Sequence, residues 1–250
     1  MDSMLPIRPL HFLLRRAPLP WPMAMLVLLL VLPPAAVATE IAIASPAALS
    51  LRGTAIGANS VVSPQAQQLA EWIAVTGDHA GAPFIIVDKK RARVLVFEPD
   101  ARLRAHSAVL LGLAPGDVSV PDIGTRPMAQ ILPAERTTPA GRFVAELGRN
   151  TQGEDVVWVD YDAAVSMHRV RTGNPVEKRA ARLASPTIDD NRISYGCINV
   201  PVAFYENFIQ PIFARRKAMV YVLPEIKSVD EVFGISPASS TKSAANSSGQ

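Results

Sequence analysis

The chain contains a single cysteine, Cys197, in the segment SYGCIN at residues 194–199. One cysteine excludes an internal disulfide framework and a cysteine-based zinc cluster. A lone thiol is buried and inert, paired between two chains, or used as a reactive group. The helix that we predict directly after this segment would point backbone amides at the sulfur and lower the thiol pKa from its ordinary value of ~8.5. Cys197 is therefore a candidate nucleophile.

A thiolate that transfers acyl groups also needs a general base, and histidine is the usual choice. The four histidines are His11, His79, His106 and His168. The first lies in an expected leader, the second in a loop rich in glycine, and the third between polar residues of a predicted strand, so the second and third are expected to face solvent. The fourth ends an apolar stretch, where a histidine at a strand end can meet a distant cysteine. His168 is the candidate base.

The backbone around the thiol is a second source of catalytic groups. The amides of Tyr195, Gly196 and Cys197 are candidate donors for an oxyanion hole, because they lie beside the nucleophile. Gly196 has no side chain and would let the backbone come close to a substrate.

Most of the elements that must position these groups are predicted to be strands. Apolar and β-branched runs predict strands at residues 84–88, 93–97, 103–111, 143–147, 156–159, 163–167 and 219–223. Residues 89–92 are expected to form a hairpin turn between the first two. Helices are predicted at 64–75, 174–184 and 200–213, with Pro211 weakening the last turn of the third. Many short strands with few helices indicate a mainly β domain.

The chain ends differ from this core in composition. Arg8, Arg15 and Arg16 precede an apolar run at 23–32, and Ala36-Val37-Ala38 follows, which is typical of a secretory signal at 1–38. The apolar run is shorter than the ~20 residues of a spanning helix, so membrane contact is expected only through an uncleaved leader. We assign 39–82 to an extension or linker with a short helix, 83–224 to the catalytic domain and 225–250 to a disordered tail.

Charge excludes one class of partner. The formal net charge is only +3, with 25 Lys and Arg against 22 Asp and Glu, and part of the excess lies in the leader. No strong basic patch points to nucleic acid. The oligomeric state is left open.

Three segments in order resemble a known family. SYGCIN with an upstream histidine is similar to the signature of the L,D-transpeptidases (the YkuD-type domain), which reads His, a spacer, then Ser/Thr-His-Gly-Cys-x-Asn. TPAGRF at 138–143 resembles the family's Thr-Pro-x-Gly-x-Phe segment, and residues 84–112 resemble its opening hairpin. The resemblance covers roughly residues 83–224.

This resemblance implies a β-rich α+β fold, a β-sandwich with one or two short helices, and acyl transfer on peptidoglycan in the cell envelope. Cys197 would attack the carbonyl of the third stem residue and expel D-Ala, with His168 as base and the carbonyl of Arg169 orienting its ring. The acceptor would be an amine, giving a cross-link or an anchored protein, or water. No metal or other cofactor is required.

Basic residues near the catalytic segments are candidates for holding the carboxylates of a stem peptide, since arginine binds a carboxylate at two points. Arg192 and Arg169 are favoured because they adjoin those segments; Ser194 and Asn199 are further candidate substrate-binding residues. Lys178, Arg179 and Arg182 are expected to form a solvated helix face.

The chain departs from the family pattern at three places. Tyr195 stands where many members have a second histidine, Arg169-Val170 follows His168 in place of Gly and Ser/Thr, and 29 positions separate His168 from Cys197, with 171–192 as an inserted flap. Two alternatives are therefore kept. One is a catalytically silent wall-binding module with the same fold. The other is a cysteine wall peptidase of papain type, although such enzymes place the cysteine before the histidine.

Overall fold

The computed structural model describes residues 61–235. The predicted signal at 1–38 and the last part of the predicted tail, 236–250, lie outside the described residues. No helix within residues 61–235 is long and apolar enough to cross a membrane.

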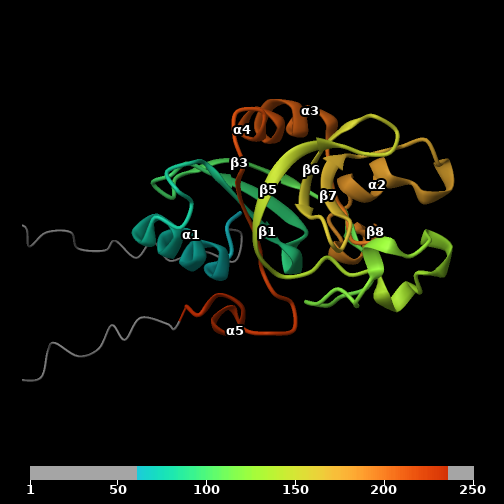
Figure 1. Cartoon of the computed structure of the whole chain (residues 1–250), viewed down its shortest axis with the longest axis horizontal. Helices are drawn as coiled ribbons and strands as arrows, with labels where there is room; N and C mark the ends of the chain where they lie inside the picture. Colours follow the sequence, from blue (N-terminus) through green and yellow to red (C-terminus); the bar gives the residue numbers. More distant parts are fainter. Residues whose placement is uncertain (1–60, 236–250) are drawn as a thin grey trace, which may run out of the picture. The chain divides into compact units, whose positions relative to one another are not determined.

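The fold is built on an eight-stranded sheet in the order β3-β2-β1-β10-β5-β6-β7-β9 (Figure 1). Its strands are β1 (Phe84–Asp88), β2 (Arg93–Phe97), β3 (Leu103–Ala108), β5 (Gly141–Arg149), β6 (Asp155–Asp160), β7 (Val165–Arg169), β9 (Ile198–Val200) and β10 (Ala218–Val222). A smaller sheet pairs β4 (Leu111–Gly112) with β8 (Arg192–Ser194). The prediction of a mainly β domain is confirmed; the strands β8 and β9 were not predicted.

Strand β1 is buried on both faces, which explains its unbroken apolar sequence. Ile85 and Val87 pack into one core cluster, while Phe84 and Ile86 pack into a second cluster on the other face. The sheet therefore needs cover on both sides, and helices supply it.

Helix α1 (Pro64–Thr76) covers one face of the sheet. Its first turn is capped by Ser63, whose hydroxyl accepts from the amide of Ala66 at 3.1 Å, and it ends at Gly77 in the left-handed conformation. Leu69 and Ile73 pack in the same cluster as Phe84. Because this face is buried on the sheet, α1 is part of the folded domain and not of a linker.

The helical segment predicted at 200–213 covers the other face (Figure 1). It consists of α3 (Val202–Phe204), a π-helical turn (Tyr205–Ile209) and α4 (Gln210–Phe213). Pro211 has no amide hydrogen for an α-helical bond to the preceding turn, and the π-helical turn just before it accommodates that loss.

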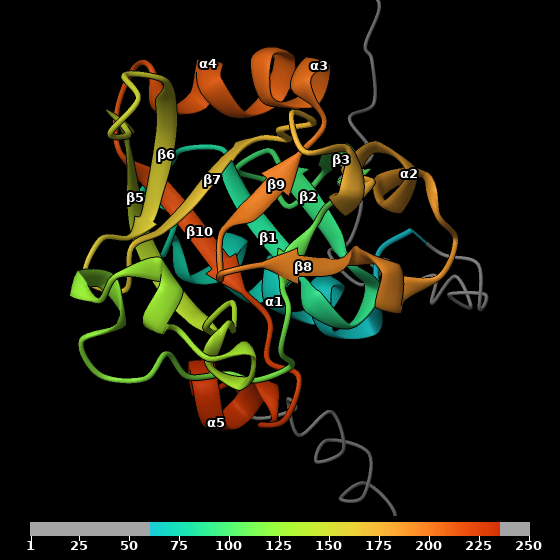
Figure 2. The ribbon, with the colours of Figure 1, turned by 90° about the vertical axis from the view of Figure 1, so that its right-hand side faces the viewer.

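The edge strand β9 lies between two parts of the chain that are far apart in sequence. It pairs in parallel with β7, with His168 opposite Asn199. On its other side Leu110 exchanges two backbone hydrogen bonds with Asn199, of 2.9 and 2.8 Å. Strand β8, which pairs in parallel with β4, lies next to β9 (Figure 2). The turn at 195–197 between β8 and β9 is thereby held next to β7.

The remaining helices are short. They are α2 (Arg179–Ala184), α5 (Val229–Phe233) and six 3-10 turns, which are Lys89–Arg91, Ile123–Thr125, Met128–Gln130, Pro133–Glu135, Pro175–Glu177 and Ile188–Asn191. Helices are thus few and short beside the sheet in the described part of the chain, in agreement with the expected mainly β fold. Residues 225–235, which we assigned to the tail, differ from that expectation: Ser228 and Glu231 form a capping box on α5, and Ile235 is buried.

Candidate active site

A cavity of about 510 Å³ opens between β6, β7 and the segment that follows β7. Five of the residues singled out from the sequence line it, namely His168, Ser194, Tyr195, Cys197 and Asn199. Residues from the predicted flap, Gly173, Asn174, Glu177 and Arg179, line its other side. The fold therefore gathers the candidate nucleophile and base at one cavity, although they come from different strands.

Cys197 lies in the turn between β8 and β9. The prediction that a helix begins directly after it is wrong, since β9 intervenes and α3 begins only at Val202. Its Sγ is 3.6 Å from the Ser166 hydroxyl and 3.6 Å from the carbonyl oxygen of Ala164, both from the β7 region. The electrostatic environment of the thiol is therefore set by β7 and not by a helix terminus.

His168 comes from β7, where its neighbour on the same face two residues earlier is Ser166. Its Nδ1 lies 2.8 Å from the carbonyl oxygen of Arg169. A carbonyl only accepts hydrogen bonds, so Nδ1 carries the proton in this contact and Nε2 is left as the acceptor. In the neutral form of this tautomer, Nε2 is the ring nitrogen that can accept a proton.

The pKa of the Cys197 thiol is lowered from its ordinary value. Burial is the largest single effect and raises it, but a hydrogen bond and the charge of His168, together with hydrogen bonds from Ser166, outweigh burial. Ser166 was not singled out from the sequence, because only the parallel register of β7 and β9 brings it to the sulfur.

The candidate oxyanion donors are not equivalent. The Gly196 amide donates to Ser194 Oγ at 3.1 Å, so it is not a free donor and our expectation for it is wrong. The amides of Tyr195 and Cys197 have no hydrogen-bond partner among residues 61–235. Two of the three predicted amides therefore stay available.

Gly196 is required for a different reason from the one we expected. Its φ of +131° lies in a region that side-chain-bearing residues rarely adopt, and an added Cβ would meet the carbonyl oxygen of Thr137 at 2.7 Å. The glycine lets the turn pack against the backbone of Thr137, whereas we expected it to make room for a substrate.

Gly196→Ala is expected to abolish reaction of Cys197 with acyl donors, because the turn must move away from Thr137 to relieve both strain and contact. Intact-mass measurement of acylated protein over time would show the loss. Alanine at Gly173, which lines the same cavity with no atom within 4 Å of an added Cβ, is the matched control. Equal loss in both variants would contradict this explanation.

The structure does not bring Arg192 to the cavity. Its guanidinium is largely buried, pairs with Glu225, and donates to the carbonyl oxygens of Lys89 at 3.2 Å and Gly112 at 3.5 Å. The prediction that Arg192 binds substrate is corrected, because its charge and donors are used inside the protein.

Ser194 and Asn199 line the cavity, and each donates a hydrogen bond into the turn at 195–197. Ser194 Oγ donates to the carbonyl oxygen of Cys197 at 2.6 Å, and Asn199 Nδ2 donates to the same oxygen at 3.3 Å. These contacts hold the turn.

Arg169 contributes its backbone and its side chain in different directions. The carbonyl faces His168, as the family resemblance implies, while the guanidinium pairs with Asp155 at 2.9 Å and Glu206 at 3.1 Å and lies over the ring of Tyr205. These partners occupy the side chain that we favoured as a carboxylate-binding group.

The position of Arg179 differs most clearly from our expectation. We expected it on a solvated face, but its side chain is 15% exposed, lines the cavity and donates to Asn199 Oδ1 at 2.6 Å. Lys178 is exposed as expected, and Arg182 is half-buried. The cluster of basic residues after β7 indicated that one of them could lie near the site, but the sequence does not show which side chain points into the cavity.

The structure also places Tyr195 and the two remaining described histidines, His79 and His106. The guanidinium carbon of Arg136 lies 3.9 Å from the centroid of the Tyr195 ring. A cation–π contact therefore supports Tyr195 in the cavity wall. His79 is buried, not solvated, with Nδ1 3.2 Å from the carbonyl oxygen of Ile73. His106 is exposed on β3 as predicted.

Comparison with known proteins yields structural likeness only. No family model and no curated protein matches the chain. Among solved structures it is similar to the helical cell shape determining protein Pgp2 from Campylobacter jejuni, with 16% identity over 65% of this chain and 57% of that one and a TM-score of 0.38. It is also similar to L,D-transpeptidase 1 of Mycobacterium tuberculosis, with 14% identity over 56% of this chain and 61% of that one and a TM-score of 0.30. A third similar structure is the catalytic domain of the E. faecium L,D-transpeptidase, with 16% identity over 57% of this chain and 98% of that one and a TM-score of 0.30.

The chain spans less than two thirds of the Pgp2 and M. tuberculosis chains. These identities and TM-scores are too low to assign an activity to it.

Proposed function

We propose that the protein is an exported, cysteine-dependent acyltransferase that acts on peptidoglycan stem peptides, an L,D-transpeptidase. The observation that carries the proposal is that Cys197 and His168 line one cavity, with Nδ1 of the histidine 2.8 Å from the Arg169 carbonyl oxygen. The order of the histidine and the SYGCIN segment in the chain supports the same reading.

In the first step Nε2 of His168 accepts the thiol proton and Cys197 Sγ attacks the carbonyl carbon of the third stem residue. The carbonyl electron pair moves to oxygen, where the free amides of Tyr195 and Cys197 can donate. Collapse of this intermediate breaks the C–N bond to D-Ala, and the histidine returns its proton to the leaving amine. A thioester and free D-Ala result.

In the second step an acceptor attacks the thioester. His168, again neutral, takes a proton from the attacking amine or water, and the thiolate leaves. An amine acceptor gives a cross-link or an anchored protein, while water gives a trimmed stem peptide. The reaction needs no metal or other cofactor.

Two arginines line the cavity, and each already has a carboxylate partner. Arg171 pairs with Glu154, while Arg179 pairs with Glu177 at 2.5 Å and donates from Nη1 to Asn199 Oδ1 at 2.6 Å. For either guanidinium to bind a stem-peptide carboxylate at two points, the substrate must replace that partner. Action on stem peptides also requires export, which the N-terminal signal predicted from the sequence would provide.

The test is intact-protein mass spectrometry of the purified chain incubated with a disaccharide-tetrapeptide, beside Cys197→Ala. A covalent adduct lacking one D-Ala, seen only with Cys197 present, is the expected result. Decay of the adduct with a diamino acid amine or with water alone then identifies the acceptor. An adduct that keeps its D-Ala would contradict cleavage at the L,D bond.

The two alternatives give different outcomes. A catalytically silent module would form no adduct, and its thiol would react slowly with iodoacetamide at neutral pH. A cysteine peptidase would release peptide fragments from inside the stem, with no D-Ala set free.

A further inference from the structure

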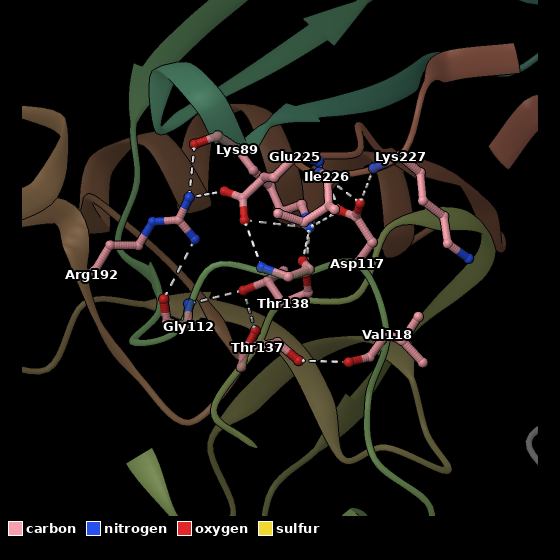
Figure 3. Close-up of polar contacts among 12 residues, drawn as sticks. Lys89, Gly112, Asp117, Val118, Thr137, Thr138, Arg192, Glu225, Ile226 and Lys227 are labelled. Atoms are coloured by element: carbon pink, nitrogen blue, oxygen red, sulfur yellow. Dashed lines mark hydrogen bonds and ion pairs between the residues drawn. The ribbon is translucent and has the colours of Figure 1, made fainter. Parts of the chain in front are cut away.

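Figure 3 shows a buried group of charged residues, namely Lys89, Asp117, Arg192 and Glu225. A hydrogen bond from Thr138 connects this group to the turn at 195–197, which we call the catalytic turn. The side chain of Lys89 is 0% exposed, although the sequence placed it in a hairpin turn. Its Nζ is 2.9 Å from Asp117 Oδ1, donates to the carbonyl oxygen of Thr138 at 2.8 Å, and also donates to that of Gly116. An ammonium with three close acceptors is held in place, and it holds Thr138 in turn.

Asp117 anchors this group to a distant part of the chain. Its two oxygens accept from the consecutive amides of 225–227 at 2.7, 2.8 and 2.7 Å. The Glu225 carboxylate accepts from the Gly116 amide at 2.9 Å and pairs with Arg192 (Figure 3). Each charged group has a partner of opposite sign, so the backbone segments that carry them are fixed relative to one another.

Thr138 links this group to the catalytic turn. Its hydroxyl accepts from the Gly112 amide at 2.9 Å and donates to the carbonyl oxygen of Gly196 at 2.8 Å. The residue is 1% exposed, so these bonds are shielded from bulk solvent. The one hydroxyl hydrogen of Thr138 is therefore committed to Gly196.

The carbonyl of Gly196 and the amide of Cys197 belong to the same peptide unit. In a planar trans peptide the C=O and N–H bonds point in opposite directions. With the oxygen held by Thr138 inside the protein, the Cys197 N–H is turned to the other side, and it has no partner within residues 61–235. This is the amide nearest to the attacking sulfur.

We infer that Thr138 is a positioning residue for acyl transfer: it holds the Gly196 carbonyl so that the Cys197 amide is turned toward the developing oxyanion. This inference rests on the proposed role of Cys197 as an acyl-transfer nucleophile. It does not depend on peptidoglycan as the substrate, so it can be tested with a general acyl donor.

The probe is p-nitrophenyl acetate. The thiolate forms a C–S bond to the ester carbonyl carbon, the π electron pair moves to oxygen, and its return expels p-nitrophenolate to leave an acetylated cysteine. Iodoacetamide serves as the reference, because the same thiolate displaces iodide from a saturated carbon and no oxyanion forms. The ratio of the two rates isolates oxyanion stabilisation from thiol reactivity.

Thr138→Val removes the hydroxyl with little change in shape, and Thr138→Ser keeps it. The matched control is Thr137→Val, because Thr137 is nearly as buried but its hydroxyl donates to the carbonyl oxygen of Val118 at 2.9 Å and not to the turn. All four proteins are compared as full chains.

Thr138→Val is expected to slow acetylation by about tenfold or more, since complete removal of an oxyanion donor costs about 10²–10³-fold. Its rate with iodoacetamide is expected to stay within about twofold, with Thr138→Ser and Thr137→Val close to the unsubstituted protein in both assays.

An equal fall in both rates for Thr138→Val would mean that the hydroxyl only stabilises the turn, and it would overturn the inference. The same holds if Thr137→Val loses as much acetylation, or if the unsubstituted protein reacts with iodoacetamide but not with the ester. Failure of the proposed function is recognised separately, as normal acetylation without an adduct from the disaccharide-tetrapeptide.

Discussion

His168→Gln is expected to lower acyl transfer by about 10²–10⁴-fold, the usual contribution of a positioned general acid–base group. Glutamine keeps a polar side chain of similar reach but takes no proton from the thiol. The loss would be measured as the rate of adduct formation with the disaccharide-tetrapeptide by intact mass.

The same substitution is expected to change how Cys197 responds to pH. In the unsubstituted protein the pKa of the thiol is lowered because His168 and Ser166 outweigh burial. Without His168 the effect of burial prevails, so the pKa rises and less thiolate is present at neutral pH. The midpoint of the iodoacetamide rate profile would therefore move to higher pH.

The exposed His106 provides the control, since it lies outside the cavity. His106→Gln is expected to leave both the adduct rate and the pH midpoint unchanged. A His168→Gln protein with an unshifted midpoint would contradict the assignment of His168 as the partner of the thiol.

Lys89→Met is expected to destabilise the protein by about 3–5 kcal/mol, the cost of removing one partner of a buried ion pair. Methionine fills similar volume but leaves the Asp117 carboxylate without its buried ammonium, 2.9 Å away in the native protein. Burial lowers the pKa of Lys89 to about 8, against the effect of Asp117, so the ammonium is present at pH 7 and the comparison is made there.

Lys90→Met is the matched control, because Lys90 is the exposed neighbour on the same turn. It is expected to change stability by no more than about 0.5 kcal/mol. Urea unfolding of the two variants and the unsubstituted protein gives the free energies. Equal midpoints for Lys89→Met and Lys90→Met would show that the buried pair does not stabilise the fold.

Local pattern was enough to predict much of the framework. The strands at 84–88 and 93–97 and the helix at 64–75 follow from residue types and periods within a few positions, and the structure has β1, β2 and α1 there. The candidate nucleophile and base also came from the sequence, because a lone cysteine in a recognisable segment and a histidine at a strand end are local features. Their meeting at one cavity agrees with that expectation.

Local pattern misled where a polar side chain had a distant partner. Lys89 stands in a stretch of basic residues between two strands, which is typical of an exposed turn, yet Asp117 and the carbonyl of Thr138 surround it in the interior. Distant partners also explain the two arginines. We expected Arg192 to bind substrate, but it pairs with Glu225 inside the protein. We expected Arg179 on a solvated face, but it lines the cavity and donates to Asn199.

The sequence by itself determined the mainly β class and most of the strands, and it singled out Cys197 and His168 as candidates for the site. Only the tertiary structure decided that the thiol is influenced by β7 and not by a helix, and that Thr138 holds the peptide before Cys197. The physical reason is that alternation and helical period report which residues are buried within one element. A hydrogen bond or ion pair between elements depends on their register in space, which no local period encodes.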